Sequence, residues 1–253
     1  MRFGVSVATV GEFADPRVHQ RLAGAAERAG WDGYFVWDGV AHRYRPVLEP
    51  FVGLAAIATA TERVLIGPLV SAVVFHSPRQ LIASIATLAR LSGGRLILGA
   101  GAGDAPDPEL AARGEPPLAA RARELDARLA QLRDGLAAEQ VAVPIWVGAQ
   151  DPLAHPGTMR RAGRYDGICP IAVDPSPATV AEIVRRVGEL RARAGTPFDV
   201  AVFSRFATVR REEAAALVAE YASAGATWLI ESLLPWEHPG DAAVALLGRG
   251  VPR

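Results

Sequence analysis

Residues 86–101, ATLARLSGGRLILGAG, contain one complete transition from helix to strand. The Ala- and Leu-rich part has the spacing of a helix up to Leu91. The two glycines that follow let the chain end that helix in a left-handed conformation. A continuous apolar run then starts after Arg95, which is typical of a parallel strand covered on both faces. This stretch therefore predicts a helix that ends directly before a buried strand.

The same alternation continues along the whole chain. Short β-rich runs alternate with longer helical segments, as in βα units on a parallel sheet. Eight units in 253 residues favour a closed (β/α)8 TIM barrel over an open doubly wound sheet, because such a barrel needs roughly 250 residues. We expect one α/β domain over residues 1–253. Its strands are expected at 3–7, 33–37, 64–70, 95–100, 144–148, 166–170, 198–203 and 227–231.

Proline and glycine mark the ends of the expected helices. Asp15, Ser77 and Ser176 each precede a proline, where their side chains can cap a first turn. Five glycines follow helical stretches and are expected to be left-handed, namely Gly30, Gly93, Gly163, Gly195 and Gly225. The helices are expected at 16–29, 49–60, 78–91, 118–138, 155–162, 177–194, 212–224 and 239–247.

Composition argues against several classes of protein. Lys plus Arg number 27 and Asp plus Glu number 27, and no basic run marks a nucleic-acid surface. The longest apolar run, 64–75, contains Gly67 and Pro68 and falls short of the roughly 20 residues that span a bilayer. Cys169 is the one cysteine, and no signal-peptide pattern follows Met1. We expect a cytoplasmic protein without nucleic-acid or membrane partners.

Candidate site residues lie in the loops after the strands, where barrel enzymes build their active sites. The longest such loops are 38–47 and 101–117. Asp38 ends the second strand, and its carboxylate would orient a bound ring or hydroxyl, unless it only caps the loop. His42 and His76 are candidates for proton transfer near neutral pH, with a solvated loop role as the alternative.

Other chemistries have little support. The five histidines include no pair at metal-ligand spacing. Ser71 and Ser204 lack the Gly-x-Ser-x-Gly elbow of acyl-transfer enzymes. The glycines of residues 99–103 match half of a dinucleotide fingerprint, but no helix opens after them. Cys169 is expected to be packed among apolar neighbours.

Several stretches, taken in order, resemble one family. They are WDGYFVWD at 31–38, ATATERVLIG at 58–67, the 86–101 stretch, PIWVG at 144–148, RRAGRYDG at 160–167 and, more faintly, ASAGATW at 222–228. Together they are similar to the luciferase-like monooxygenase superfamily of flavin- and deazaflavin-dependent barrel enzymes. The resemblance covers most of the chain.

This resemblance implies a flavin-dependent oxidoreductase, a monooxygenase that uses FMN on an unknown small organic substrate. The alternatives are hydride transfer with the deazaflavin coenzyme F-420, a non-catalytic flavin-binding barrel or, last, an unrelated barrel enzyme, since a fold alone does not determine chemistry. It also implies a non-prolyl cis peptide bond between Leu69 and Val70. A homodimer through residues 51–57 and 81–85 is expected as well, because both segments are apolar almost all round.

The resemblance also implies the site residues. Small residues at the mouth would let a flat ring approach the backbone, and N–H groups near 148–158 would bind a phosphate, assisted by Arg160 or Arg161. Asp38 and His42 are the expected catalytic residues. The cofactor is expected to contact Ala8, Asp38, Leu69, Val70, Ser71, Gly101, Gly148, Ala149, Gln150, Gly157 and Thr158.

Three features depart from the family pattern. Gly39 stands where many relatives carry a histidine, and residues 138–143 join the fourth helix to the fifth strand with a shortened insertion. Residues 149–158 lack a recognisable phosphate fingerprint. The sequence therefore does not decide which substrate the protein takes, which of the two cofactors it binds, or whether it is catalytically active.

Overall fold

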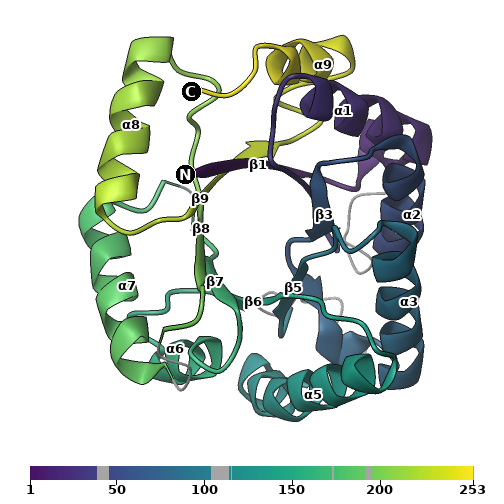
Figure 1. The fold of residues 1–253 in the computed structure, drawn as a ribbon, viewed down its shortest axis with the longest axis vertical. Coiled ribbons are helices and arrows are strands. Elements are labelled where there is room, and N and C mark those ends of the chain that lie inside the picture. Colours follow the sequence, from purple (N-terminus) through teal and green to yellow (C-terminus); the bar gives the residue numbers. More distant parts are fainter. Residues whose placement is uncertain (39–45, 104–113, 115, 173, 192–194, 253) are drawn as a thin grey trace.

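The strands form a ring at the centre of the protein, and the helices surround it (Figure 1). The computed structural model describes residues 1–38, 46–103, 114, 116–172, 174–191 and 195–252. Its strands are β1 Arg2–Val7, β2 Gly33–Val36, β3 Leu65–Pro68, β4 Ser71–Ala72, β5 Leu98–Gly101, β6 Ile145–Ala149, β7 Gly167–Pro170, β8 Asp199–Phe203 and β9 Trp228–Leu233.

All strand pairs are parallel, in the order β3-β2-β1-β9-β8-β7-β6-β5-β4. A parallel bridge between Ile66 and Leu96 joins β3 to the chain that leads into β5. Here the Ile66 N–H donates to the Arg95 carbonyl and the Ile97 N–H to the Ile66 carbonyl, both at 2.9 Å. The sheet is therefore closed, as the predicted TIM barrel requires.

Each expected helix is present, with ends that shift by a few residues. The helices are α1 Pro16–Arg28, α2 Pro50–Ala60, α3 Pro78–Leu91, α5 Leu118–Ala138, α6 Pro156–Ala162, α7 Pro177–Leu190, α8 Arg211–Ser223 and α9 Asp241–Gly248, with 3-10 turns η1 Gly11–Ala14 and η2 Val73–Phe75. The expected end of α7 at 194 lies outside the described residues. None of the described helices is long and apolar enough to cross a membrane.

The third expected strand is divided in two. The peptide bond between Leu69 and Val70 is cis, which confirms the prediction made for this bond. β3 ends at Pro68 and β4 begins at Ser71, so the single strand expected over 64–70 is wrong in its last part.

Four of the five glycines expected to be left-handed have positive φ angles, namely Gly30, Gly93, Gly195 and Gly225. The prediction for Gly163 is wrong, because its φ is −60°. A Cβ there would lie 2.9 Å from the Leu190 carbonyl oxygen. Gly163 therefore permits a close approach between α6 and the end of α7.

The face opposite the mouth is held together by Arg95. Its guanidinium donates to the carbonyls of Ala58, Thr61, Val64 and Ser92 and to the Thr61 hydroxyl, at 2.8–3.0 Å. Arg95 thereby ties the ends of α2 and α3 to the start of β3. Arg95, from the opening stretch, therefore has a structural role at this face of the barrel.

Three aromatic rings fill the middle of the barrel. The ring centroids of Phe35, Trp146 and Trp228 lie 5.3–5.9 Å apart, and all three side chains are fully buried. A Cβ at Gly33 would lie 2.6 Å from the Phe35 ring, so that position must stay small. Because these rings fill the interior, a ligand inside the barrel is expected at the carboxyl ends of the strands, where barrel enzymes build their sites.

Candidate functional site

Val70 occupies the side of the mouth formed by β4, β5 and β6. A Cβ on either Gly101 or Gly148 would lie 3.0 Å from a methyl carbon of Val70. These glycines therefore make room for Val70. The expectation that small residues at the mouth let a flat ring approach the backbone stays a prediction. A ligand on this side of the mouth would rest on Val70.

Asp38 is the centre of a hydrogen-bonded cluster at the junction of β2, β4 and η2. Its Oδ2 atom accepts from the Ser71 hydroxyl at 2.6 Å, from the Ala72 N–H at 3.3 Å and from His76 Nε2 at 2.8 Å. The Asp38 side chain is 3% exposed. The carboxylate thus binds the start of β4 and an ionisable partner, His76. The expected choice between orienting a bound ring or hydroxyl and capping the loop after β2 stays a prediction.

The environment of His76 favours the protonated ring. The hydrogen bond to Asp38 raises the pKa of His76, burial opposes this, and the charges of Asp38 and Glu49 raise it further. Its side chain is 22% exposed. Since Nε2 faces Asp38, the imidazolium would donate from Nε2 and keep Nδ1 for a second partner.

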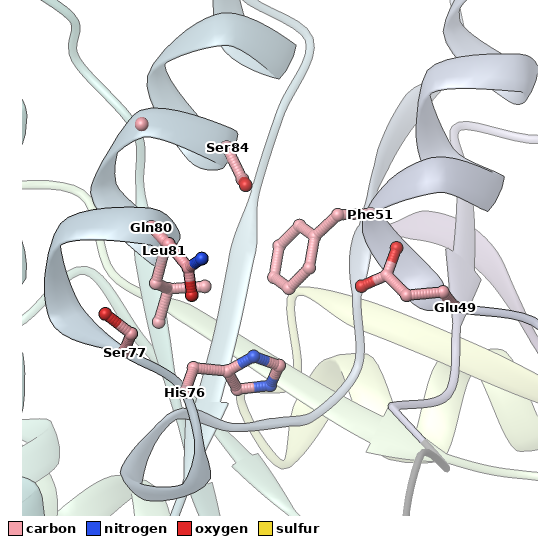
Figure 2. Close-up of a pocket in the computed structure, with 8 residues that line it drawn as sticks. Glu49, Phe51, His76, Ser77, Gln80, Leu81 and Ser84 are labelled. Atoms are coloured by element: carbon pink, nitrogen blue, oxygen red, sulfur yellow. The ribbon is translucent and has the colours of Figure 1, made fainter.

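The other side of His76 borders a groove between α2 and α3 (Figure 2). The groove has a volume of about 390 Å³ and is lined by Glu49, Phe51, His76, Ser77, Gln80, Leu81, Ala83 and Ser84. The Phe51 ring meets the His76 ring edge to face, with centroids 5.7 Å apart. The Glu49 carboxylate accepts from the Val52 N–H at 2.6 Å and so caps α2. His76 therefore lies between the buried Asp38 cluster and an outer groove.

Several residues expected at the cofactor site are buried within the barrel wall. The Ala8 N–H donates to the Leu233 carbonyl at 3.1 Å, and the Ala8 side chain is fully covered. Leu69 packs in the barrel interior, while Ala149 is buried in the layer between strands and helices. Cys169 is also buried in the interior, where desolvation raises the pKa of its thiol.

The segment expected to bind a phosphate is already partly hydrogen-bonded. Gln150 and Gly157 are exposed, but the Thr158 N–H donates to the His155 carbonyl at 2.9 Å. The Arg161 guanidinium donates to both oxygens of Asp126 at 3.0 Å and ties α6 to α5. Of the groups named for this role, Gln150, Gly157 and Arg160 are exposed.

Two further points concern the expected site chemistry. His42 lies outside the described residues. Within the described part of the chain, no three His, Cys, Asp or Glu side chains gather as a metal site. The pairing of Asp38 with His76 was not expected from sequence, because the two residues are 38 positions apart and belong to different βα units.

A sequence model described as luciferase-like monooxygenase matches residues 1–143. The chain belongs to the luciferase-like monooxygenase family. It is also 43% identical over 75 residues to an uncharacterized protein of Mycobacterium tuberculosis strain H37Rv. That match covers 30% of this chain and 26% of the relative, so the two correspond over about a quarter of the relative's length.

Solved structures share the whole fold. The F-420-dependent tetrahydromethanopterin reductase from Methanopyrus kandleri has a TM-score of 0.73 at 16% identity, covering 99% of this chain and 98% of that one. An F-420-dependent secondary alcohol dehydrogenase with an F-420–acetone adduct has a TM-score of 0.77 at 15% identity, with the same coverage. The oxygenating constituent of 3,6-diketocamphane monooxygenase from Pseudomonas putida, in complex with FMN, has a TM-score of 0.60 at 16% identity. This match covers 80% of this chain and 67% of that one. At these identities the likeness supports the barrel fold.

Proposed function

We propose that this protein is a flavin-dependent oxidoreductase that holds FMN at the mouth of the barrel and acts on a small organic molecule. The family match over residues 1–143 carries the proposal. Gly101 and Gly148 place no side chains beside Val70, which supports a flat ring on this side of the mouth. A bound flavin would supply the redox chemistry, and the protein would supply position and proton control.

Coenzyme F-420 is the second candidate cofactor. Two F-420-dependent neighbours align over 98% of their own length, whereas the FMN-containing monooxygenase aligns over 67%. The shortened connection at 138–143 is in keeping with these more compact barrels. This likeness of size is the observation that keeps F-420 as the second candidate. A barrel that binds flavin without turnover is the remaining alternative.

In this proposal His76, hydrogen-bonded to Asp38, holds a proton at the edge of the site and can donate it. Ser71 and the Ala72 N–H hold the Asp38 carboxylate, and Asp38 in turn orients the imidazole and stabilises its charged form. His42 stays a second proposed catalytic residue. Gln150, Gly157 and Thr158 are proposed to contact the cofactor phosphate. Gly157 is better placed than Thr158 to donate a backbone N–H, because the Thr158 N–H already donates to the His155 carbonyl.

The proposal also includes a homodimer in the cytoplasm. Most apolar residues of the two expected interface segments are already covered within one subunit, since Leu54, Ile57, Leu81 and Ile85 are buried. The surface left for a partner centres on Val52, which is 63% exposed. An interface there would therefore be smaller than the sequence alone implies.

A bulky residue at the mouth tests where the cofactor binds. Val70→Trp should abolish binding of FMN and of F-420, because the indole would fill the space above β5 and β6. Leu91→Trp, at the exposed C-terminal end of α3 and away from the mouth, is the matched control and should bind like the wild type. Far-ultraviolet circular dichroism checks that both variants fold. Unchanged affinity in folded Val70→Trp would place the cofactor elsewhere.

A further inference from the structure

Side chains at the mouth of the barrel divide into an interior and an outer set, because successive residues of a strand face opposite sides of the sheet. Phe35, Phe203 and Ile230 belong to the interior cluster, and the residues directly before them, Tyr34, Val202 and Leu229, belong to the outer one. The position of a residue along its strand therefore shows whether a ligand inside the mouth would meet it.

The interior set is uncharged at the carboxyl ends of three neighbouring strands, β8, β9 and β1, all of which the structure describes. Its last members there are Phe203, Ser232 and Ser6. The acidic residue of this region, Glu231, follows Ile230 directly and so faces the outer layer. A ligand bound against these three carboxyl ends would thus meet no ionised residue of the strands themselves.

Ser6 and Ser232 are register partners on β1 and β9, so they stand side by side. A Cβ on Gly4 would lie 2.8 Å from the Ile230 side chain and 2.9 Å from the Phe35 ring, so Gly4 faces the interior. Ser6, two residues after Gly4, faces the interior as well, and so does Ser232, two residues after Ile230. Neighbouring strands are about 4.8 Å apart, so a ligand oxygen between the two hydroxyls is within hydrogen-bonding reach of both.

The Ser6 hydroxyl lacks a hydrogen bond. It is fully buried, and no partner for it is present among the described residues. Buried hydroxyls are nearly always paired, because an unpaired one gives up its hydrogen bonds to water without replacement. Its neighbour Ser232 is half-buried and thus within reach of solvent. A ligand oxygen at this pair would supply the partner that Ser6 lacks.

Aromatic side chains flank the serine pair. Phe203 is the last residue of β8, next to β9, and is 8% exposed. Trp37 follows β2, next to β1, and its N–H donates to a β1 carbonyl at 3.1 Å. It lies two residues after Phe35 and continues the interior face of β2. Phe203, Ser232, Ser6 and Trp37 form what we call the serine wall, an apolar surface around two hydroxyls, as is usual in pockets for small organic molecules.

Arg205 is the charged side chain to consider beside the serine wall, because it lies two residues after Phe203. It is exposed, and its guanidinium reaches Glu237, in the loop after β9, at 3.4 Å. A charged ligand group buried against the serine wall would lose its water without gaining an opposite charge from the wall, which is costly. An uncharged ligand avoids this cost.

We propose that the serine wall binds the substrate, and that the substrate is an uncharged molecule with an apolar body and a hydroxyl or carbonyl oxygen, which Ser6 and Ser232 hold. This inference rests on the proposed function, since it leaves the other side of the mouth, where Val70 lies, to the cofactor ring. Serine hydroxyls suit both oxygen types, because they donate to a carbonyl and either donate to or accept from a hydroxyl.

Isothermal titration calorimetry of the full chain with three probes of similar size tests the substrate class. Cyclohexanone and cyclohexanol should bind, and cyclohexanecarboxylate should bind at least about 10-fold more weakly, because its charge finds no partner. Ser6→Ala and Ser232→Ala should each weaken cyclohexanone binding about 5-fold through loss of one hydrogen bond. Ser204→Ala is the matched control and should bind like the wild type, since this buried serine follows Phe203 directly and so faces the outer layer.

Circular dichroism checks that the variants fold, and FMN and F-420 are titrated in the same samples. Three results would overturn the inference: no binding of either neutral probe to the cofactor-free protein, equal affinity for the ketone and the carboxylate, or unchanged cyclohexanone affinity in both folded serine variants. A loss of cofactor affinity in a serine variant would do the same, because the pair would then contact the cofactor. Failure of both cofactors to bind the wild type contradicts the proposed function instead, and the probes still decide whether the serine wall binds an uncharged molecule.

Discussion

His19 should make the free energy of unfolding fall as the pH falls. Its Nε2 lies 2.7 Å from the Phe13 carbonyl oxygen and its Nδ1 lies 2.9 Å from the Tyr34 hydroxyl. These contacts suit a neutral ring that donates from Nε2 and accepts at Nδ1. The side chain is fully covered, and burial lowers the pKa of His19 from 6.5 to about 4.

The sign and size of the effect follow from that shift. The unfolded chain binds the proton first, so the stability due to neutral His19 is complete above pH 6.5 and is lost as the pH falls toward 4. A shift of this size corresponds to about 3 kcal/mol in total. Of this, about 2 kcal/mol should be lost between pH 7 and pH 5.

Urea unfolding of the wild type and His19→Gln at pH 7 and pH 5 tests this reasoning. The glutamine amide keeps a donor for the Phe13 carbonyl but does not titrate. The wild type should therefore lose about 2 kcal/mol more than His19→Gln on acidification. Tyr34→Phe is the control, because it removes one contact and keeps the titrating ring. An equal loss of stability in the wild type and His19→Gln would refute the reasoning.

Four further predictions concern the site, the barrel and the assembly. Asp38→Ala should weaken cofactor affinity or turnover with an unchanged circular dichroism spectrum, and unaltered binding and kinetics would leave Asp38 a loop cap. Gly148→Ala should cost about 1–3 kcal/mol in thermal unfolding by crowding Val70, and Val70→Ala should restore much of the loss in the double variant; no restoration would argue against that contact. Arg95→Lys should cost about 2–4 kcal/mol, because lysine cannot reach the same carbonyls, and an unchanged Tm would contradict this. Light scattering at micromolar concentration should give a particle of two chains, and a monomer would remove the dimer from the proposal.

Local sequence patterns predicted most of the fold. Each helix and most strands are specified by a nearby pattern, and the closed ring follows from the count of units and the length of the chain. The division of the third expected strand into β3 and β4 was not predicted. The cis bond at Leu69–Val70 came from the family resemblance, because nothing in that dipeptide itself indicates it. The position of Gly163 shows a limit, since a glycine after a helix can serve a close approach instead of a left-handed turn.

The candidate site was less predictable because it depends on contacts between units. Asp38 and His76 were each noted, but their hydrogen bond forms only when the second and third units are packed together. The contact of Val70 with Gly148 was not predictable for a similar reason, because Val70 lies between β3 and β4, which were expected as a single strand.

The central claim is that this barrel binds a flavin-type cofactor, and a titration of the purified protein tests it most directly. FMN and coenzyme F-420, each oxidised and reduced, would be added while absorbance and fluorescence are followed. The account predicts saturable binding of at least one of them, with a stoichiometry of one per chain and a loss of binding in Val70→Trp. If neither cofactor binds in either redox state, the proposed function is contradicted.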